Sequence, residues 1–419
     1  MAYGGTPLRV LFAPETFNLG ETSRGIEVAR QLRRWGHEVR FMGYSRRFVD
    51  HVREAGFPID LLAPELTEEQ ADQLIAADQG RSLRHPFTTK MMRERVASEL
   101  DLYRSWDPDC VVIGTTLSTF ISTRAAGVPL IYVRPYAMSR SHLAVMDSFP
   151  VSQGETWLGG QVNKLAGRLV RAVLPTIRWK PASIVRAAAE HRVRLPSSTL
   201  EALDGDLNLI ASLFAHLNQQ ETSASEIAVG PIYAQVGDDL PDEVAALAAT
   251  GRPLVYVGLG SSGNRRLGLE ILHQVAELDV EIVSTLGRFL RAGDREQLPT
   301  NVHVHDFLPA HKLAGLIAAS VIHGGEGTVQ TACASGAPFA GIGLQAEQRF
   351  NIDECVRHGN AARFTPGDIR RRRLPGIVTR LLADPSMRRS AVALQERARP
   401  VGAENAAREM VRYAVSRRS

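Results

Sequence analysis

The stretch His323-Gly324-Gly325-Glu326-Gly327-Thr328 decides how the second half of the chain is interpreted. It follows an apolar run, Leu316–Ile322, that predicts a buried strand, and residues 328–334 have helical spacing. Glycines let a backbone approach a ligand closely. The free N–H groups and the dipole at a helix N-terminus favour an anion such as a diphosphate. The sequence therefore predicts a phosphate site at this turn, which we call the glycine turn (residues 323–328).

A second pair of polar residues, Glu347 and Gln348, follows 24 residues after His323. The pair comes just after Pro338–Ile342, a further predicted strand. In open α/β sheets, ligands bind at the carboxyl edge of the strands. A carboxylate accepts hydrogen bonds from two hydroxyls, and an amide both accepts and donates. We therefore expect this pair to bind the hydroxyls of a sugar.

Together with Asn351, these residues resemble the donor site of the GT-B glycosyltransferases, in particular the UDP-glycosyltransferase-like family with its bacterial macrolide and antibiotic members. That family has a His-Gly-Gly-x-Gly-Thr/Ser turn, an acid-Gln pair and then Asn, and all three recur here in order. The resemblance implies an α/β fold with two Rossmann-like domains facing across a cleft. It also implies a hexosyltransferase that moves a sugar from a nucleoside diphosphate, UDP or dTDP, to a small-molecule acceptor, without a metal and with inversion.

The resemblance extends to other positions of the donor site. Gly260, Ser261 and Ser262 match a Gly-Ser loop after the first strand of the second domain, although an ordinary turn fits as well. Phe307 and Leu308 match the segment that holds the base, where an aromatic ring can stack, although a core Phe fits equally. Arg288 is interpreted as a solvated surface residue. The full set of predicted donor-binding residues is Gly20, Gly260, Ser261, Ser262, Phe307, Leu308, His323, Gly325, Glu326, Gly327, Thr328, Glu347, Gln348 and Asn351.

The catalytic residues of the resembled family are missing. Its Gly-His pair falls on Gly20-Glu21, and its helping Asp falls on Gly114. Glu21 is then a candidate general base, because partial burial raises a carboxyl pKa towards a useful value. Arg24, at i+3 on the same predicted helix, is a candidate to orient Glu21 or to bind an anionic acceptor. Alternatively, Glu21 is a first-turn acid that stabilises helix 22–35, and the sequence leaves both possibilities open.

Residues 136–195 form the least regular part of the first half and are expected to bind the acceptor. The candidate acceptor-binding residues are Tyr136, His142 and Met146. Within this region, Val162–Trp179 is amphipathic and basic. It is interpreted either as a helix packed on its domain with a solvated face, or as an interfacial helix in contact with anionic lipid.

Composition narrows the class of protein further. The chain has 419 residues, 44% of them hydrophobic, and a net charge of +4, so it lacks a nucleic-acid signature but suits an anionic nucleotide or a membrane surface. Cys110, Cys333 and Cys355 have neither metal nor disulfide spacing, which indicates a reducing compartment. No secretory or membrane-spanning run is expected. We expect a cytoplasmic monomer or homodimer with no cofactor or metal beyond its nucleotide-sugar co-substrate.

Alternating strands and helices predict parallel sheets in both halves. We expect an acceptor-binding domain over residues 1–229 and a linker over 230–250, with Gly230-Pro231 and an acidic cluster. A donor-binding domain is expected over 251–398. The resemblance implies that a final helix, 399–419, crosses back to the first domain.

Three other functions stay open at this point. The protein could be a glycosyltransferase that acts on a lipid acceptor at a membrane surface, with peripheral membrane contact. It could be a sugar-nucleotide epimerase of the same fold, although the varied segment 136–195 argues against that. The missing His–Asp dyad also allows a non-catalytic subunit that binds a nucleotide sugar.

Overall fold

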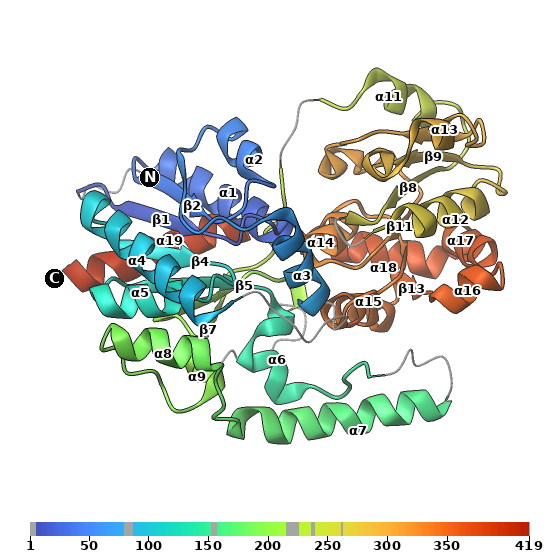
Figure 1. The fold of residues 1–419 in the computed structure, drawn as a ribbon. Helices are drawn as coiled ribbons and strands as arrows, with labels where there is room; N and C mark the ends of the chain where they lie inside the picture. Colours follow the sequence, from blue (N-terminus) through green and yellow to red (C-terminus); the bar gives the residue numbers. More distant parts are fainter. Residues whose placement is uncertain are drawn as a thin grey trace. The chain divides into compact units, whose positions relative to one another are not determined.

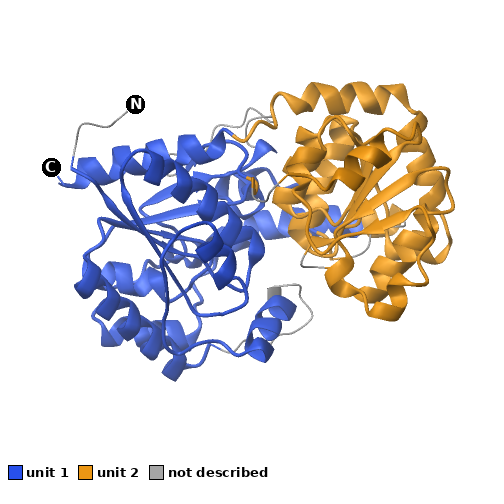
Figure 2. Ribbon diagram, turned by 90° about the horizontal axis from the view of Figure 1, so that it is seen from above, with its two compact units in different colours: residues 1–149, 161–232, 401–419 blue, residues 150–160, 233–400 orange. Residues whose placement is uncertain are grey.

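The computed structural model describes residues 6–78, 87–151, 157–214, 226–235, 239–260 and 263–418. The chain forms two compact units (Figure 2). The first comprises Met1–Phe149, Gln161–Ile232 and Val401–Ser419, and the second comprises Pro150–Gly160 and Tyr233–Pro400. In the described part of the chain, no helix has the length and apolar character needed to cross a membrane.

The first unit is built on a seven-stranded parallel sheet in the order β3-β2-β1-β4-β5-β6-β7 (Figure 1). Its strands are β1 (Arg9–Ala13), β2 (Glu38–Gly43), β3 (Ile59–Leu61), β4 (Cys110–Ile113), β5 (Leu130–Arg134), β6 (Leu207–Ile210) and β7 (Glu226–Ala228). The central strands β4 and β5 are buried throughout. Because helices cover both faces of a parallel sheet, both sides of these strands are buried, and their sequences are continuous apolar runs.

The helices of the first unit connect these strands. They are α1 (Leu19–Arg34), α2 (Val49–Glu54), α3 (Glu68–Asp78), α4 (Thr89–Trp106), α5 (Thr119–Ala126), α6 (Arg140–Val145), α7 (Trp157–Val173), α8 (Ala182–Glu190), α9 (Thr199–Ala202) and, from the chain's end, α19 (Gly402–Arg418). The first four residues of α7, 157–160, are grouped with the second unit. Met410 and Val411 of α19 lie in one core cluster with Val28 and Leu32 of α1. The C-terminal helix thus completes the core of the first unit, beside α1 (Figure 1).

The second unit has a six-stranded parallel sheet in the order β10-β9-β8-β11-β12-β13. Numbered within the unit this is the order 3-2-1-4-5-6 of a Rossmann fold. Its strands are β8 (Leu254–Gly258), β9 (Glu281–Ser284), β10 (Val302–Val304), β11 (Ala319–Ile322), β12 (Phe339–Gly341) and β13 (Ala361–Arg363). Its helices are α11 (Asp242–Ala248), α12 (Arg265–Val275), α13 (Ala292–Arg295), α14 (Glu326–Ala334), α15 (Ala346–His358), α16 (Pro366–Arg370), α17 (Leu374–Ala383) and α18 (Pro385–Gln395).

The α/β class and the two Rossmann-like sheets predicted from the sequence are confirmed. The apolar runs of the sequence predict a strand at each of the other positions, but not at β7 and β13, which have only three residues each and lie at a sheet edge. Both contain a charged residue and too few apolar ones to stand out as a run. Because β8 lies between β9 and β11, the loops after these three strands meet at one carboxyl edge.

Candidate active site

The glycine turn joins β11 to α14 in the second unit. β11 ends at Ile322, and α14 begins at Glu326 with Gly325 as its N-cap. The carbonyl of Gly325 accepts from the Val329 N–H at 2.9 Å, so the helix starts two residues earlier than the sequence predicted. The N–H groups of residues 326–328 therefore lie in the first turn, where a helix has no partners of its own for them.

The imidazole of His323 packs closely against the backbone of two glycines, Gly260 and Gly325. A Cβ added to Gly260 would lie 2.7 Å from Nε2 of His323, and one added to Gly325 would lie 2.5 Å from the same atom. Real Cβ atoms do not come that close, so a side chain at either position would displace the ring. The loop after β8 and the turn after β11 are thus brought together around His323. The neighbouring Ser261 and Ser262 lie outside the described residues.

Burial lowers the pKa of His323 to about 4. The carbonyl of Gly258 opposes this shift, and the positive charge of Arg288 adds to it. The ring is therefore neutral near pH 7. A neutral imidazole has a single N–H group, and the tautomer of His323 decides whether this group faces the Gly258 carbonyl or an anion at the turn.

Arg288, which was interpreted as a solvated surface residue, lies close enough to the glycine turn for its charge to act there. It lies on η4 (Gly287–Phe289), directly after β9, and its charge acts on His323. Its side chain is exposed, yet partial burial lowers the pKa of its guanidinium. The signal in the sequence was its position at the carboxyl end of a strand that neighbours β8. The structure thus adds a cation to the surroundings of the glycine turn.

The predicted sugar-binding residue Gln348 has a structural role in α15. Its Oε1 accepts from the backbone N–H of Leu344 at 3.0 Å and of Gln345 at 3.2 Å. Its Nε2 donates to Oε1 of Gln345 at 2.5 Å, and the side chain is only 2% exposed. This is a capping box, in which the third residue of a helix reaches back to its N-cap. The amide oxygen is therefore committed to the helix start.

Asn351 ties α15 to the glycine turn. Its Nδ2 donates to the carbonyl of Gly324 at 3.1 Å, and the side chain is 1% exposed. The same Nδ2 lies 3.5 Å from Oε1 of Glu347. Glu347 is partly exposed at the first turn of α15. Asn351 therefore positions the turn, while Glu347 remains accessible.

The remaining predicted donor residues of the second unit differ in exposure. Phe307, in the loop after β10, is 56% exposed and is not the core residue that the sequence equally allowed. Its neighbour Leu308 is buried, so its side chain belongs to the packing of the loop. Glu326 is buried at the start of α14, whereas Gly327 is exposed and Thr328 partly exposed.

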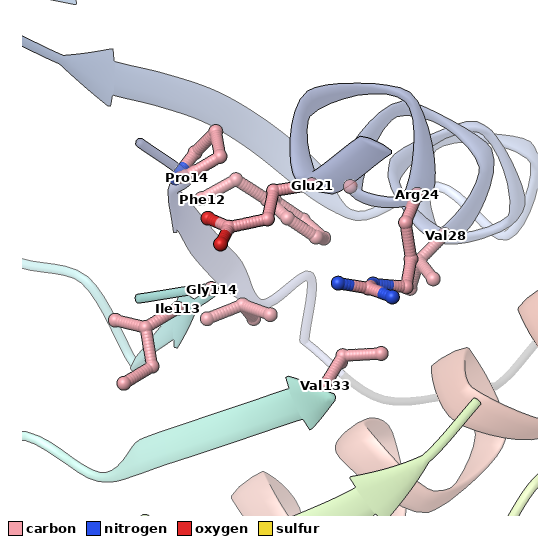
Figure 3. Close-up of a pocket in the computed structure, with 10 residues that line it drawn as sticks. Phe12, Pro14, Glu21, Arg24, Val28, Ile113, Gly114 and Val133 are labelled. Carbon is pink, nitrogen blue, oxygen red and sulfur yellow. The ribbon is translucent and has the colours of Figure 1, made fainter. Parts of the chain in front are cut away.

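In the first unit, Glu21 points from α1 towards the carboxyl ends of β1 and β4 (Figure 3). Its Oε1 accepts from the Thr115 hydroxyl at 2.7 Å. Its Oε2 accepts from the backbone N–H of Thr115 at 3.1 Å and of Glu15 at 3.2 Å. These contacts fix both carboxylate oxygens. Sequence reasoning did not find Thr115 or Glu15, because neither belongs to a recognisable motif.

Helix α1 is capped by Asn18 and not by Glu21. Oδ1 of Asn18 accepts from the N–H of Gly20 at 3.0 Å and of Glu21 at 3.4 Å. Glu21 does lie in the first turn of α1, as the alternative interpretation requires, but the side-chain cap is Asn18. Gly20 was predicted to contact the donor, and its N–H group is used in this cap.

The carboxylate of Glu21 occupies the space next to Gly114. A Cβ added to Gly114 would lie 2.5 Å from Cδ of Glu21. Any side chain at position 114 would thus overlap with the carboxylate. The two departures from the resembled family, Glu in place of His and Gly in place of Asp, are sterically linked.

Glu21 and Arg24 line a small hollow in the first unit, together with Phe12, Pro14, Gly114 and Val133 (Figure 3). Burial raises the pKa of Glu21, while the Thr115 hydrogen bond and the charge of Arg24 oppose the shift. A carboxylate with a raised pKa that borders a hollow is suited to accept a proton.

The carboxylate of Glu15 forms a buried ion pair with Arg95 at 2.9 Å, and both side chains are almost fully enclosed. Because the backbone N–H of Glu15 donates to Glu21, this pair braces the segment that holds Glu21. A buried pair of this kind is costly to break at one end only.

The candidate acceptor residues lie around α6. Tyr136 and His142 are buried and pack edge to face, with ring centroids 5.3 Å apart. Met146, which follows α6, is partly exposed. In this structure Tyr136 and His142 support one another, and only Met146 reaches the surface. The described residues contain no group of three or more His, Cys, Asp or Glu side chains that could hold a metal ion.

Comparisons with known proteins agree with this arrangement. Residues 269–412 match the model of the erythromycin biosynthesis protein CIII-like C-terminal domain. A PGL/p-HBAD biosynthesis rhamnosyltransferase of Mycobacterium bovis (strain BCG / Pasteur 1173P2) is 28% identical over 406 residues, which cover 93% of this chain and 84% of that protein. The 4'-demethylrebeccamycin synthase of Lentzea aerocolonigenes is 28% identical, covering 77% of this chain and 76% of that protein.

Among solved structures, the glycosyltransferase VinC in complex with dTDP has a TM-score of 0.71 at 20% identity and covers 98% of this chain and 100% of that one. Two Rossmann-like units with a glycine turn at the carboxyl edge of the second are the arrangement of the GT-B fold, which this chain shares with its structural neighbours. The chain is a glycosyltransferase with that fold.

Proposed function

We propose that this enzyme transfers a sugar from a nucleoside diphosphate sugar, with dTDP or UDP as the nucleotide, to the hydroxyl of a small-molecule acceptor. The observation that carries the proposal is His323, held between Gly260 and Gly325 at the N-terminus of α14. The transfer proceeds by direct displacement with inversion and without a metal ion.

The second unit supplies the leaving-group half of the reaction. Negative charge builds on the diphosphate as the bond to the sugar breaks. The first-turn N–H groups of α14 and the His323 N–H stabilise that charge, as preorganised donors do in other transfer enzymes. Arg288 adds a positive charge to the same region. This set of donors performs the task that a metal ion has in other transferases.

The first unit supplies the base. Glu21 accepts the proton of the acceptor hydroxyl while Thr115 and the Glu15 N–H hold its carboxylate in place. Burial raises the pKa of Glu21, and a general base works best when its pKa lies near the working pH of the enzyme. Arg24 lines the same hollow and orients either the carboxylate or the acceptor.

The comparisons support the choice of donor. A structural neighbour was solved with dTDP, and a relative is named as a rhamnosyltransferase. A dTDP-linked deoxyhexose is therefore the first donor to test, with Glu347 as the residue that contacts its hydroxyls. The exposed face of Phe307 is available for the base.

The test begins with binding. A ligand that binds only the folded protein at 100 times its Kd raises stability by about 2.7 kcal/mol. We expect dTDP or UDP, but neither GDP nor dTMP, to raise the melting temperature. Products from dTDP-rhamnose and UDP-glucose with a panel of phenolic and polyketide acceptors are then followed by mass spectrometry, with and without EDTA.

Each outcome separates one function from another. A glycosylated product that forms equally well in EDTA supports metal-independent transfer. Conversion of the donor sugar into an epimer without acceptor would identify an epimerase. Tight diphosphate binding with no product from any acceptor would leave a nucleotide-sugar-binding subunit, and no diphosphate binding at all would overturn the donor site.

A further inference from the structure

Helix α7 presents an apolar stripe to solvent. Its five members follow helical spacing, and each is between 44% and 68% exposed: Leu158, Val162, Leu165, Leu169 and Val173. Isolated apolar residues on a surface are ordinary, but a continuous stripe marks a contact surface. We call these five residues the α7 stripe.

Four of the five residues of the α7 stripe belong to the first unit, and they lie on the side of the helix opposite the residues that pack against that unit. Asn163 and Gly167 are the buried residues of α7. The carbonyl of Asn163 accepts from the Phe149 N–H at 2.9 Å, and a Cβ on Gly167 would lie 2.5 Å from the backbone nitrogen of Ser148. Leu165 is two residues from both, which at about 100° per residue places it on the opposite side of the helix.

The chain around the stripe is strongly basic. Residues 157–189 contain six basic residues and no Asp or Glu: Lys164, Arg168, Arg171, Arg178, Lys180 and Arg186. The whole chain has a net charge of only +4, so the basic charge is concentrated here. Lys164 and Arg168, both exposed, immediately precede Leu165 and Leu169 of the stripe.

Two exposed tryptophans lie at the ends of this segment. Trp157 begins α7 and is 75% exposed, and Trp179, which follows η2 (Leu174–Thr176), is 71% exposed. Tryptophan prefers the interface between water and lipid, where its ring lies among apolar groups and its indole N–H donates a hydrogen bond to water or a headgroup. Apolar stripe, basic flank and terminal tryptophans together are the features of a helix that lies in a membrane interface.

We propose that α7 docks on the surface of an anionic lipid bilayer, with the α7 stripe among the acyl chains and Lys164 and Arg168 at the lipid phosphates. Charge favours this occupant over a second copy of the chain. A two-fold contact through α7 would bring two copies of this basic segment together, and the segment has no Asp or Glu to pair with the basic residues of the other copy. The proposal does not rest on the proposed glycosyl transfer and concerns where the enzyme works.

Co-sedimentation with vesicles tests the docking. The full chain is mixed with phosphatidylglycerol/phosphatidylcholine vesicles and with pure phosphatidylcholine vesicles, at low and high salt. We expect binding to the anionic vesicles that high salt weakens, with a blue shift of tryptophan fluorescence that is lost in Trp157→Phe/Trp179→Phe. Each basic residue near an anionic surface contributes about fivefold in partitioning, so Lys164→Ala/Arg168→Ala should lower it roughly 25-fold.

Matched variants on α18 control for charge and polarity. Leu165→Glu/Leu169→Glu should abolish vesicle binding, while Val392→Glu and Arg388→Ala/Arg389→Ala, which change exposed residues of α18, should not. Since all of these positions are exposed, each variant is expected to fold, and its melting temperature checks this. Equal binding to neutral vesicles, or no binding at low salt, would overturn the proposal. So would a dimer in analytical ultracentrifugation that Leu165→Glu/Leu169→Glu dissociates.

Discussion

Replacing Glu21 by Gln tests the proposed base directly. Gln has nearly the same volume, and its amide oxygen can accept from the two backbone N–H groups that Glu21 Oε2 now serves. Its NH₂ group would face the Thr115 hydroxyl, which can turn to accept a hydrogen bond. The exchange therefore keeps the hydrogen bonds of the site and removes only the basicity.

The two possible roles of Glu21 predict different magnitudes. General-base catalysis contributes about 10²–10⁴-fold, so kcat of Glu21→Gln should fall by that order. A role limited to packing predicts a change of about 1 kcal/mol or less in the free energy of unfolding, with kcat near that of the wild type. Measuring kcat and the melting temperature on the same sample separates them.

The pH dependence adds a second signature. Burial raises the pKa of Glu21 above its ordinary value of 4.5. A raised folded-state pKa means that the protonated carboxyl contributes stability below pH 4.5, and that this contribution is lost as pH rises through the folded pKa. Glu21→Gln has no such loss, so its melting temperature should improve relative to that of the wild type as pH rises above 4.5 and through the folded-state pKa of Glu21. Its kcat should also lack the acidic limb.

The matched control is Glu27→Gln, a second largely buried glutamate of α1 that pairs with Arg30 at 2.8 Å. It should keep kcat within about twofold, because it does not line the hollow. A Glu21→Gln enzyme with near-normal kcat and an unchanged acidic limb would refute the assignment of the base.

The other predictions concern single side chains of the two sites. His323→Ala should weaken dTDP or UDP binding by about 1–3 kcal/mol in calorimetry, equally from about pH 6 to about pH 9 because the pKa of His323 is about 4; unchanged affinity would remove it from the site. Arg288→Ala should lose about 1.5–3 kcal/mol of diphosphate affinity with no change in melting temperature, and a solvated arginine would show no loss. Gly114→Ala should lower the free energy of unfolding by about 1–3 kcal/mol and reduce kcat, since its Cβ would displace Glu21; a stable, active variant would contradict that overlap. Glu347→Ala should leave affinity for the bare nucleotide within about twofold yet cut turnover roughly tenfold or more, and a parallel loss of both would place Glu347 at the nucleotide.

The glycine turn could be predicted from the sequence because all of its determinants are local. A strand, three glycines and a helix start lie within a dozen residues, and the groups that such a turn offers to a ligand are backbone N–H groups. The two parallel sheets were likewise predictable from apolar runs separated by helical stretches, whereas the order of their strands was not predicted. The start of α14 was misplaced by two residues because a Gly N-cap has no side chain to signal it.

The individual side chains were less predictable, because long-range packing decides their roles. Gln348 was expected to bind a sugar, and the fold shows in addition that its amide oxygen belongs to a capping box. Thr115 is 94 residues from Glu21 in sequence, so no local sequence pattern predicts the hydrogen bonds between them. Tyr136 and His142 looked available in an irregular segment and are buried against one another.

The overlap between Glu21 and position 114 has a consequence for how this chain can diverge from its relatives. While Glu21 keeps its position, any side chain at 114 displaces its carboxylate, so an aspartate introduced there first would disturb the glutamate that is already in place. A route between the two kinds of site is therefore expected to have an order, in which the residue at 21 changes before the residue at 114. The intermediate on that route lacks a carboxylate at both positions, so selection on activity opposes the path from either end, and a lineage with the glutamate is expected to keep both residues together.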